Sequence, residues 1–423
     1  MWAQPLPPRR ITPTPADSDN SRHPLSSALS PRGQSMTHPM NSATAISGLG
    51  ITKMGRVYRS APDLAAEAVM LALDDAGLDK SDVDGLLVNA GIRPDVGLQL
   101  HVSLGLAELN LLTFMQGYGS SAGQMIQYAA MAVANGLANT VACVFADAPL
   151  REGQRTGASY ARGGGSDALG ALHGLYGFVG ANASFAMAAQ RHMGLYGTTS
   201  DQLGQIAIGQ RQWAAMNPRA TKREPMTLED YHSSPWVIEP FHILDCCLVS
   251  NGGVCVIVTS AERARDNQQP PVYLRGFGQG HQHDTGLVEK DYAVCGPGAE
   301  VSARALAMAD VQLEEITQCQ LYDCYTYTVL DTLEDYGFCE KGEGGAFVED
   351  GKLAPGGTLP TNTGGGELSS YYMWGMTPIS EAVIQGRGQG GERQVRNDLI
   401  LTSGNGGMLN YHSTLVLSPE AAA

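Results

Sequence analysis

The sequence lacks the features that mark membrane-spanning, exported or nucleic-acid-binding proteins. It has no run of about 18 consecutive apolar residues, the length that a bilayer-spanning helix needs. Basic residues are scarce, with 27 Lys and Arg against 42 Asp and Glu and a formal net charge of -15, which disfavours a phosphate-backbone partner. The Arg9-Arg10 pair has no apolar stretch after it and does not indicate an export signal. We therefore expect a cytoplasmic protein without a membrane span or a nucleic-acid partner.

Cysteine occurs in no pattern that would hold zinc or build a disulfide framework. The chain has 8 cysteines, with Cys246 and Cys247 as the one adjacent pair and no Cys-x-x-Cys. Most lie in apolar, strand-like runs, where a free cysteine behaves as a small buried hydrophobe. We expect no bound metal.

The N-terminal segment lacks apolar periodicity. Residues 1–44 are rich in Pro, Ser and Thr, a composition that cannot offset the entropy of ordering. The prediction is a disordered N-terminal extension. A further hypothesis is that Met36 or Met40 is the true start and that the preceding segment is upstream sequence.

From residue 44 onward, strand-like and helix-like segments alternate. Strands are predicted at 44–50, 83–88, 140–145, 252–258 and 318–321, and helices at 64–76, 123–137 and 327–336. Gly77 is expected to end the first of these helices. The alternation predicts an α/β protein with a parallel sheet covered by helices. With 423 residues, the chain is long enough for two domains or one duplicated domain.

A short internal repeat supports duplication. Residues 73–88 resemble residues 306–321, and both read as a helix end, a short acidic connector and a strand. Residues 151–238 interrupt the pattern and carry Arg211, Trp213 and the Lys222-Arg223 pair. Taken alone, this segment predicts a surface excursion with two amphipathic helices.

Three C-terminal segments resemble the thiolase superfamily, and most closely its sterol-carrier-protein branch. They are LYDCY (321–325), NTGGGELSSYY (362–372) and SGNGG (403–407). Thiolases carry His-Asp-x-Phe, Asn-x-x-Gly-Gly…Gly-His-Pro and Cys-x-Gly-Gly there. In this sequence the two histidine positions hold Tyr322 and Tyr372, and the late cysteine position holds Gly404.

The resemblance implies a thiolase fold, a duplicated five-layered α-β-α-β-α sandwich with a loop domain over the CoA. An N-terminal half at 45–270 would include the loop domain (about 151–238), and 271–423 would form the C-terminal half. The segment EPFHILDCC (239–247) is similar to the Pro-x-x-x-Leu-Asp-Cys-Cys signature of the same branch, although Asn251 replaces the usual Asp further on.

The nucleophile of thiolases is missing. Aligning Gly-Ser-Ser-Ala (119–122) with the family's Gly-Ser-Thr-Ala puts Gln116 at the nucleophile position, and a carboxamide cannot form a thioester. The same stretch matches Gly-x-Ser-x-Gly around Ser121, which leaves a serine hydrolase as an alternative.

The exchange of two histidines for tyrosines resembles the lipid-transfer-protein aldolases of bacterial steroid side-chain degradation. It implies retro-aldol cleavage of a β-hydroxyacyl-CoA, with a steroid side-chain thioester as one candidate, into a ketone or aldehyde and a shorter acyl-CoA such as propionyl-CoA. Each tyrosine has a plainer interpretation, Tyr322 as a strand-edge aromatic and Tyr372 as part of a hydrophobic plug. His412 is interpreted as a strand residue rather than a replacement base.

Retro-aldol cleavage needs two proton-transfer groups and donors for an enolate oxygen. Tyr322 and Tyr372 would transfer the protons, which requires a lowered pKa or a relayed proton because phenols titrate near pH 10. The backbone of Gly404, Asn405 and Gly406 would bind the oxyanion. Which tyrosine serves which carbon is left open.

Two other functions compete with the aldolase. One is a thiolase-type acyl-CoA acyltransferase, and the other is a non-catalytic acyl-CoA or lipid-binding protein. The resemblance further implies a homodimer and a small zinc-binding OB-fold partner. No bound cofactor is expected, with CoA entering only as part of the substrate.

Overall fold

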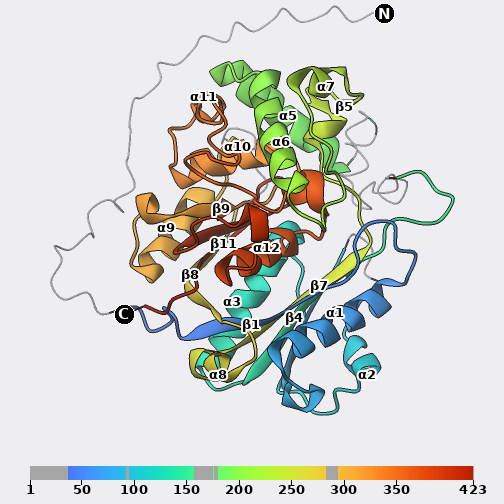
Figure 1. Cartoon of the computed structure of the whole chain (residues 1–423), viewed down its shortest axis with the longest axis vertical. Helices are drawn as coiled ribbons and strands as arrows, with labels where there is room; N and C mark the ends of the chain where they lie inside the picture. The colour runs from blue at the N-terminus through green and yellow to red at the C-terminus, as the bar shows by residue number, and fades with distance from the viewer. Residues whose placement is uncertain (1–36, 92–94, 157–174, 176–179, 283–293, 423) are drawn as a thin grey trace, which may run out of the picture. The chain divides into compact units, whose positions relative to one another are not determined.

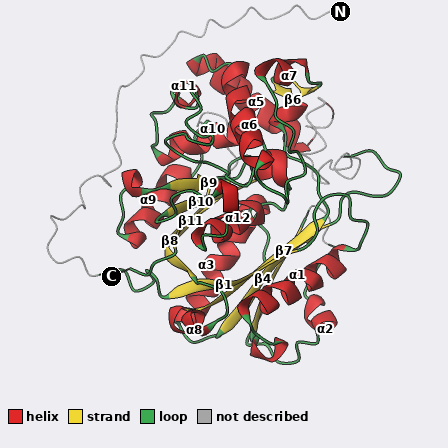
Figure 2. Ribbon diagram, in the orientation of Figure 1, coloured by secondary structure: helices red, strands yellow, loops and turns green. Residues whose placement is uncertain are grey.

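The computed structural model describes residues 37–91, 95–156, 175, 180–282 and 294–422 (Figures 1 and 2). The strands are β1 (Thr44–Ile51), β2 (Gly85–Ala90), β3 (Leu111–Phe114), β4 (Thr140–Asp147), β5 (Trp236–Ile238), β6 (Phe241–His242), β7 (Gly252–Ser260), β8 (Val272–His281), β9 (Gln318–Gln320), β10 (Ile400–Gly406) and β11 (Tyr411–Ser418). The α-helices are α1 (Ala61–Ala76), α2 (Leu100–Leu104), α3 (Ser121–Ala134), α5 (Gly180–Tyr196), α6 (Ser200–Ala215), α7 (Leu228–Ser233), α8 (Ala261–Asp266), α9 (Gly298–Ala309), α10 (Thr326–Tyr336), α11 (Gly344–Phe347) and α12 (Met376–Gly386). Short turns that matter below are the 3-10 turns η1 (Lys80–Asp82), η2 (Tyr118–Ser120) and η4 (Leu313–Glu315) and the π-helical turn η5 (Gly366–Ser370).

The main sheet consists of two half-sheets joined at a narrow seam. Its strand order is β3-β2-β4-β7-β1-β8-β11-β10-β9. The two halves meet where β1 pairs with β8, and this pairing covers Ala45↔Tyr273 and Ile46↔Val272. Each half is therefore a separately built sheet, as expected for a duplicated domain.

The sheet is mixed, so the prediction of a parallel sheet is only partly correct. β2 runs parallel to β3 and β4, and β9 runs parallel to β10. β7 and β11, the last strands of their halves, run antiparallel to their neighbours. A tight turn at Gly407, whose φ is 62°, links β10 to β11, and so short a link permits only antiparallel pairing.

The helices build the expected five layers (Figure 1). α1 packs on β1, β4 and β7, and α9 packs on β8 and β11, so these two helices form the outer layers. α3 and α12 contact each other and strands of both halves, which makes them the central layer. The expected α-β-α-β-α order is thus present.

The internal repeat predicted from the sequence is a structural repeat. α1 ends at Gly77 and α9 ends at Asp310, and both residues adopt the left-handed conformation, with φ of 70° and 54°. A 3-10 turn follows each helix, and its last acidic residue accepts the N–H three residues earlier, Asp82 at 2.8 Å and Glu315 at 2.7 Å. A strand, β2 or β9, then enters the sheet.

The folded part of the chain begins before residue 45, where the N-terminal half was predicted to start. Asn41 is buried and donates its side-chain N–H to the carbonyl of Ala309, and the Ser42 N–H donates to Leu274. Residues 1–36 lie outside the described residues, so their predicted disorder stays a prediction. The division into halves at 270/271 also stays a prediction.

The interrupting segment is not a surface excursion, because its central helix α6 is packed against the C-terminal half. The buried Trp213 donates its indole N–H to the carbonyl of Leu353 at 2.8 Å, and Arg211 donates to the Ser369 hydroxyl at 2.9 Å. Residues 157–174 and 176–179 of the segment lie outside the described residues. The role of this segment over the CoA remains a prediction.

Paired glycines let the outer helices approach the sheet. A Cβ at Gly50 on β1 would overlap the backbone of Ala68 on α1, and a Cβ at Gly276 on β8 would overlap the backbone of Ala305 on α9. In both halves, therefore, a strand glycine packs directly against the backbone of the outer helix, which a larger residue would prevent.

We predict that Gly50→Ala and Gly276→Ala each lower the free energy of unfolding by about 1–3 kcal/mol, because overpacking must separate the helix from the sheet. Gly194→Ala is the matched control, since Gly194 is exposed on α5 with nothing near a new Cβ, and it should raise stability by up to about 1 kcal/mol. Denaturant unfolding measures all three. Equal effects of the three substitutions would contradict the close packing.

Candidate active site

The two predicted tyrosines meet. Tyr322 follows β9 and Tyr372 follows η5, and their hydroxyl oxygens lie 3.0 Å apart, within hydrogen-bond distance. Tyr322 is 4% exposed, whereas Tyr372 is only partly buried. The pair is therefore a hydrogen-bonded phenol dyad with one fully buried and one partly buried member.

Backbone hydrogen bonds to serine side chains fix both tyrosines. The N–H of Tyr322 donates to the Ser403 hydroxyl on β10 at 2.9 Å, and its carbonyl accepts from Thr328 at 3.1 Å. The N–H of Tyr372 donates to the Ser250 hydroxyl at 3.2 Å. Elements from both halves therefore position the dyad, which is the support that a precise site requires.

The buried carboxylate of Asp323 connects the two motifs. It accepts the backbone N–H of Glu367 at 2.9 Å and that of Leu368 at 3.1 Å, so it binds the start of η5. Burial raises the pKa of Asp323 to about 7, against the opposing effect of these hydrogen bonds. Asn362 adds a second link, since its side-chain oxygen accepts the N–H of Leu321 at 2.6 Å.

The turn that would carry a thiolase nucleophile lies against the dyad. Gly119, in η2, has no room for a side chain, because a Cβ there would overlap both the Tyr322 ring and the carbonyl oxygen of Asn405. Gly119 is thus the point where three segments meet. They are its own turn, the motif around Tyr322 and the glycine-rich segment around Asn405.

Gln116, which is predicted to occupy the thiolase nucleophile position, is exposed, and its side chain closes the turn that follows it. Its side-chain oxygen accepts the N–H of Tyr118 at 3.0 Å. Ser121 is buried at the start of α3, where its hydroxyl accepts the N–H of Gly117 at 2.7 Å. No histidine among the described residues is hydrogen-bonded to Ser121, so the serine-hydrolase alternative lacks its base.

Gly404, Asn405 and Gly406 lie in strand β10, not in a loop. They pair with Ser413, His412 and Tyr411 of β11, whose ladder extends to the end of the strand.

On its other edge β10 pairs with β9 only from Ile400 to Thr402. Beyond Thr402, this edge has no strand neighbour in the described part of the chain. An oxyanion role for Gly404, Asn405 and Gly406 stays a prediction.

Neither tyrosine has a lowered pKa. Burial raises the pKa of Tyr322 well above its usual range, and the nearby Glu367 carboxyl raises it further. Burial and the neighbouring Tyr322 raise the pKa of Tyr372 in the same direction. Of the two routes considered from the sequence, a lowered pKa is therefore wrong, and the relayed proton remains.

Glu367 is the residue that the sequence reasoning missed. It is fully buried on η5, and neither carboxyl oxygen has a hydrogen-bond partner among the described residues. Burial, and next the charge of Asp323, raise the pKa of Glu367 well above its usual range. In the sequence, the feature that could have pointed to it is a single glutamate in the glycine- and serine-rich stretch just before Tyr372.

Two cysteines lie beside the dyad, and burial keeps their thiols protonated. Cys247 donates its backbone N–H to the carbonyl of Cys324 at 3.0 Å, directly beside the dyad. Burial raises the pKa of both thiols well above the usual range, so neither forms a thiolate readily.

His412 is buried on β11, as expected. Burial lowers its pKa to about 3, and its ring nitrogen lies 2.7 Å from the Tyr336 hydroxyl.

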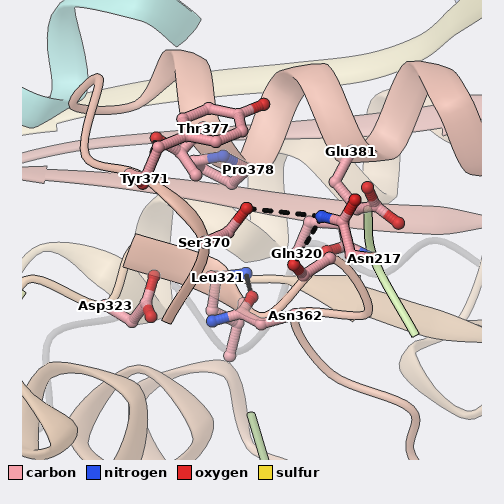
Figure 3. A pocket seen from close by; sticks show the side chains of 12 residues that line it. Asn217, Gln320, Leu321, Asp323, Asn362, Ser370, Tyr371, Thr377, Pro378 and Glu381 are labelled. Carbon is pink, nitrogen blue, oxygen red and sulfur yellow. Dashed lines mark hydrogen bonds between the residues drawn. The ribbon is translucent and has the colours of Figure 1, made fainter. Parts of the chain in front are cut away.

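A small polar cavity lies on the Asp323 side of η5 (Figure 3). Its walls include Asp323, Asn362, Tyr371 and Glu381, and Asn217 donates across it to the Ser370 hydroxyl at 3.3 Å. The cavity measures about 10 Å³, room for about one water molecule. It is far too small for an acyl-CoA.

Comparison with known proteins agrees with the fold and the motifs. Residues 278–419 match the family described as Thiolase C-terminal domain-like. The chain is 38% identical over 382 residues to the steroid side-chain-cleaving aldolase of Thermomonospora curvata, covering 86% of this chain and 95% of that protein. It is 37% identical over 361 residues to the 17-hydroxy-3-oxo-4-pregnene-20-carboxyl-CoA lyase of Mycobacterium tuberculosis, covering 82% and 92%. A solved Ltp2-ChsH2(DUF35) aldolase superposes with a TM-score of 0.80 at 36% identity, covering 90% and 98%.

The layered fold and the two tyrosine motifs define a thiolase-type protein. The matches show that the chain belongs to the thiolase superfamily and, within it, to the family of the steroid side-chain-cleaving aldolases. The resemblance inferred from the tyrosine motifs is confirmed, and the chain is an enzyme of the lyase class.

We predict that neither dyad tyrosine ionises below about pH 10, the usual value for a phenol, because burial disfavours the phenolate. Ultraviolet absorbance of tyrosinate, followed against pH, should be the same for wild type, Tyr322→Phe and Tyr372→Phe in that range. In denaturant each variant should show one ionising phenol fewer than wild type. A difference in the folded state below pH 10 would contradict the raised pKa values.

Proposed function

We propose that this enzyme is a retro-aldolase that cleaves a β-hydroxyacyl-CoA into a ketone or aldehyde and a shorter acyl-CoA such as propionyl-CoA. The observation that carries the proposal is the 3.0 Å contact between the Tyr322 and Tyr372 hydroxyls at the two former histidine positions. Two phenols in contact can pass a proton between them, and retro-aldol cleavage requires that a proton moves from the β-hydroxyl to the α-carbon.

The reaction balances without a covalent enzyme intermediate. The β-hydroxyl gives up its proton, and the electron pair of that O–H bond forms the new carbonyl. The bond between the α- and β-carbons breaks, and its electron pair becomes the thioester enolate. The enolate then takes a proton at the α-carbon. Tyr322 and Tyr372, both neutral, would relay this proton: the phenol near the β-oxygen accepts the hydroxyl proton as it passes its own to the other phenol, which gives its proton to the α-carbon.

The end of β10 is proposed to bind the enolate oxygen. This segment, Gly404 to Gly406, lies next to Gly119. Because Gly119 has no side chain, its backbone can approach both the Tyr322 ring and the Asn405 carbonyl oxygen closely. Donors placed where negative charge develops contribute about 3–4 kcal/mol each at comparable sites.

The substrate class is taken from the relatives. One relative is named for cleaving steroid side chains and another for a pregnene-20-carboxyl-CoA, so we propose a steroid side-chain CoA thioester. An acyltransferase is disfavoured because Gln116 cannot be acylated. A non-catalytic binding protein is disfavoured because a buried, hydrogen-bonded tyrosine pair beside an unpaired carboxyl has no evident packing role.

The assembly and location also belong to the proposal. The name of the solved aldolase pairs Ltp2 with a DUF35 protein, which supports the expected zinc-binding OB-fold partner, and we further propose a homodimer. The cysteines are free thiols, the state expected in a reducing cytoplasm. In the described part of the chain, no helix combines the length and apolar character of a membrane span. The proposed reaction uses no cofactor besides the CoA of the substrate.

We predict that Tyr322→Phe and Tyr372→Phe each lower kcat by about 100-fold or more, because each removes a proton-transfer group while leaving the ring in place. The Kd for the acyl-CoA should change little, since the ring contacts persist. Carbonyl release measures the first effect and calorimetric titration the second. Wild-type turnover in both variants would rule out the tyrosine mechanism.

A second test separates the three candidate functions. The enzyme, with and without a co-purified OB-fold partner, should release a carbonyl product from a β-hydroxyacyl-CoA. It should not cleave acetoacetyl-CoA in the presence of CoA, because that reaction needs an acylated nucleophile. Thiolytic cleavage of acetoacetyl-CoA would favour the acyltransferase, and binding without either reaction would favour the binding protein.

A further inference from the structure

An exposed aromatic side chain lies beside the dyad. Tyr118 is 50% exposed, although it directly precedes Gly119, whose backbone packs against the Tyr322 ring. On its other side Tyr118 adjoins β10, because a Cβ added at Gly406 would lie 3.2 Å from the Tyr118 Cβ. The Tyr118 side chain therefore starts between the first phenol of the dyad and the end of β10, where the enolate oxygen is proposed to bind.

Two strained turns hold this side chain in place. Tyr118 has a φ of 54° and Trp374 a φ of 49°, a left-handed conformation that is an outlier for bulky residues. The two turns touch through their backbones, since a Cβ at Gly375 would overlap the carbonyl oxygen of Gly119. Trp374 comes two residues after Tyr372, so the second turn belongs to the other phenol of the dyad. Backbone strain persists where the surrounding structure fixes it, and it is concentrated at active sites and ligand clamps.

Tyr118 is part of a row of four rings, which we call the aromatic row and define as Trp374, Tyr118, Tyr411 and His281. The ring centroids of Tyr118 lie 6.1 Å from those of both Trp374 and Tyr411. The ring centroids of Tyr411 and His281 lie 5.2 Å apart. Trp374 is buried, Tyr411 is partly buried, and Tyr118 and His281 are exposed. The aromatic row thus begins in the core next to the dyad and ends at the surface.

The two ends of the aromatic row are anchored. Trp374 stacks on the buried Phe145 with 5.1 Å between ring centroids, and the amide nitrogen of Gln124 lies 3.2 Å from Nε2 of His281. Tyr118 has rings on both sides, yet half of its surface stays open to solvent. A ring fixed in this way offers a large, rigid apolar face that loses little conformational entropy when a ligand packs on it.

We propose that Tyr118 is a specificity-determining residue: its exposed face, with Tyr411 beside it, contacts the apolar ring system of the acyl group while the dyad contacts the β-hydroxyl. The inference rests on the proposed retro-aldol function and deepens it, because it names the residue that selects fused-ring acyl groups. The aromatic row favours this occupant because it continues from the dyad segment. A flat, apolar ring system, such as that of the steroid thioester proposed above, matches an aromatic face in shape and polarity.

The test compares two β-hydroxyacyl-CoA substrates, one with a fused-ring acyl group and one with a short aliphatic chain. In Tyr118→Ala, the ratio of kcat/KM for the fused-ring substrate to that for the short-chain substrate should fall about 10- to 100-fold, the effect of losing one buried aromatic contact. The loss should appear mainly in KM for the fused-ring substrate. Tyr118→Gly should show the same change without backbone strain, since glycine adopts a φ of 54° freely. Tyr118→Phe keeps the ring and should restore the wild-type ratio.

Tyr58→Ala is the matched control. Tyr58 is 47% exposed and is not part of the aromatic row, so its loss should leave kcat/KM unchanged for both substrates. An equal loss of kcat/KM for the two substrates in Tyr118→Ala overturns the inference, because the ring then does not select the acyl group. Sedimentation velocity provides a further check. Dissociation of an oligomer in Tyr118→Ala but not in Tyr58→Ala also overturns the inference, since a second copy of the chain then covers the aromatic row.

Binding gives a readout that does not require turnover. Calorimetric titration uses two acyl-CoA thioesters without a β-hydroxyl, one with a fused-ring acyl group and one with a short chain. Wild type should bind the fused-ring thioester more tightly, and this preference should be lost in Tyr118→Ala and kept in Tyr118→Phe. Equal affinities in wild type overturn the inference and leave the proposed function standing. A preference that depends on Tyr118, without carbonyl release from any β-hydroxyacyl-CoA, overturns the proposed function instead.

Discussion

The site depends on one buried interaction, the Asp323 carboxylate receiving the backbone N–H groups at the start of η5. Asp323 follows Tyr322 directly, and the turn that it binds leads to Tyr372, so this side chain ties together the two segments that carry the phenols. A carboxylate that accepts backbone donors is a rigid connection, because the peptide groups themselves are held. The dyad is consequently built into the protein before any substrate arrives.

Much of the fold followed from local patterns in the sequence. The helix ends at Gly77 and the strand run at 318–321 are set by residues close in sequence, so periodicity and capping were enough to place them. The mixed direction of the sheet was not accessible in this way. It depends on which strands become neighbours, and the return of β11 beside β8 is a long-range pairing that no short window records.

The tyrosine pair was found because both members fall on motif positions, while Glu367 was missed because its importance is three-dimensional. Nothing in the sequence shows that its carboxyl group is buried without a partner. The strand placement of Gly404 was likewise hidden, since glycine-rich stretches usually indicate loops and here the partner strand β11 keeps the chain extended. Of the two routes left open for the phenols, a lowered pKa and a relayed proton, burial disfavours the first, and burial cannot be read from the motif.

The hydrogen bond between the Gln116 side chain and the N–H of Tyr118 bears on which side chains position 116 tolerates. Tyr118 has a φ of 54°, an unfavourable conformation for a tyrosine, and Gln116 supplies the acceptor that closes its turn. A cysteine at position 116 would remove that acceptor and leave the Tyr118 N–H without it. The carboxamide of Gln116 thus helps to hold a strained backbone turn that lies beside the Tyr322 ring.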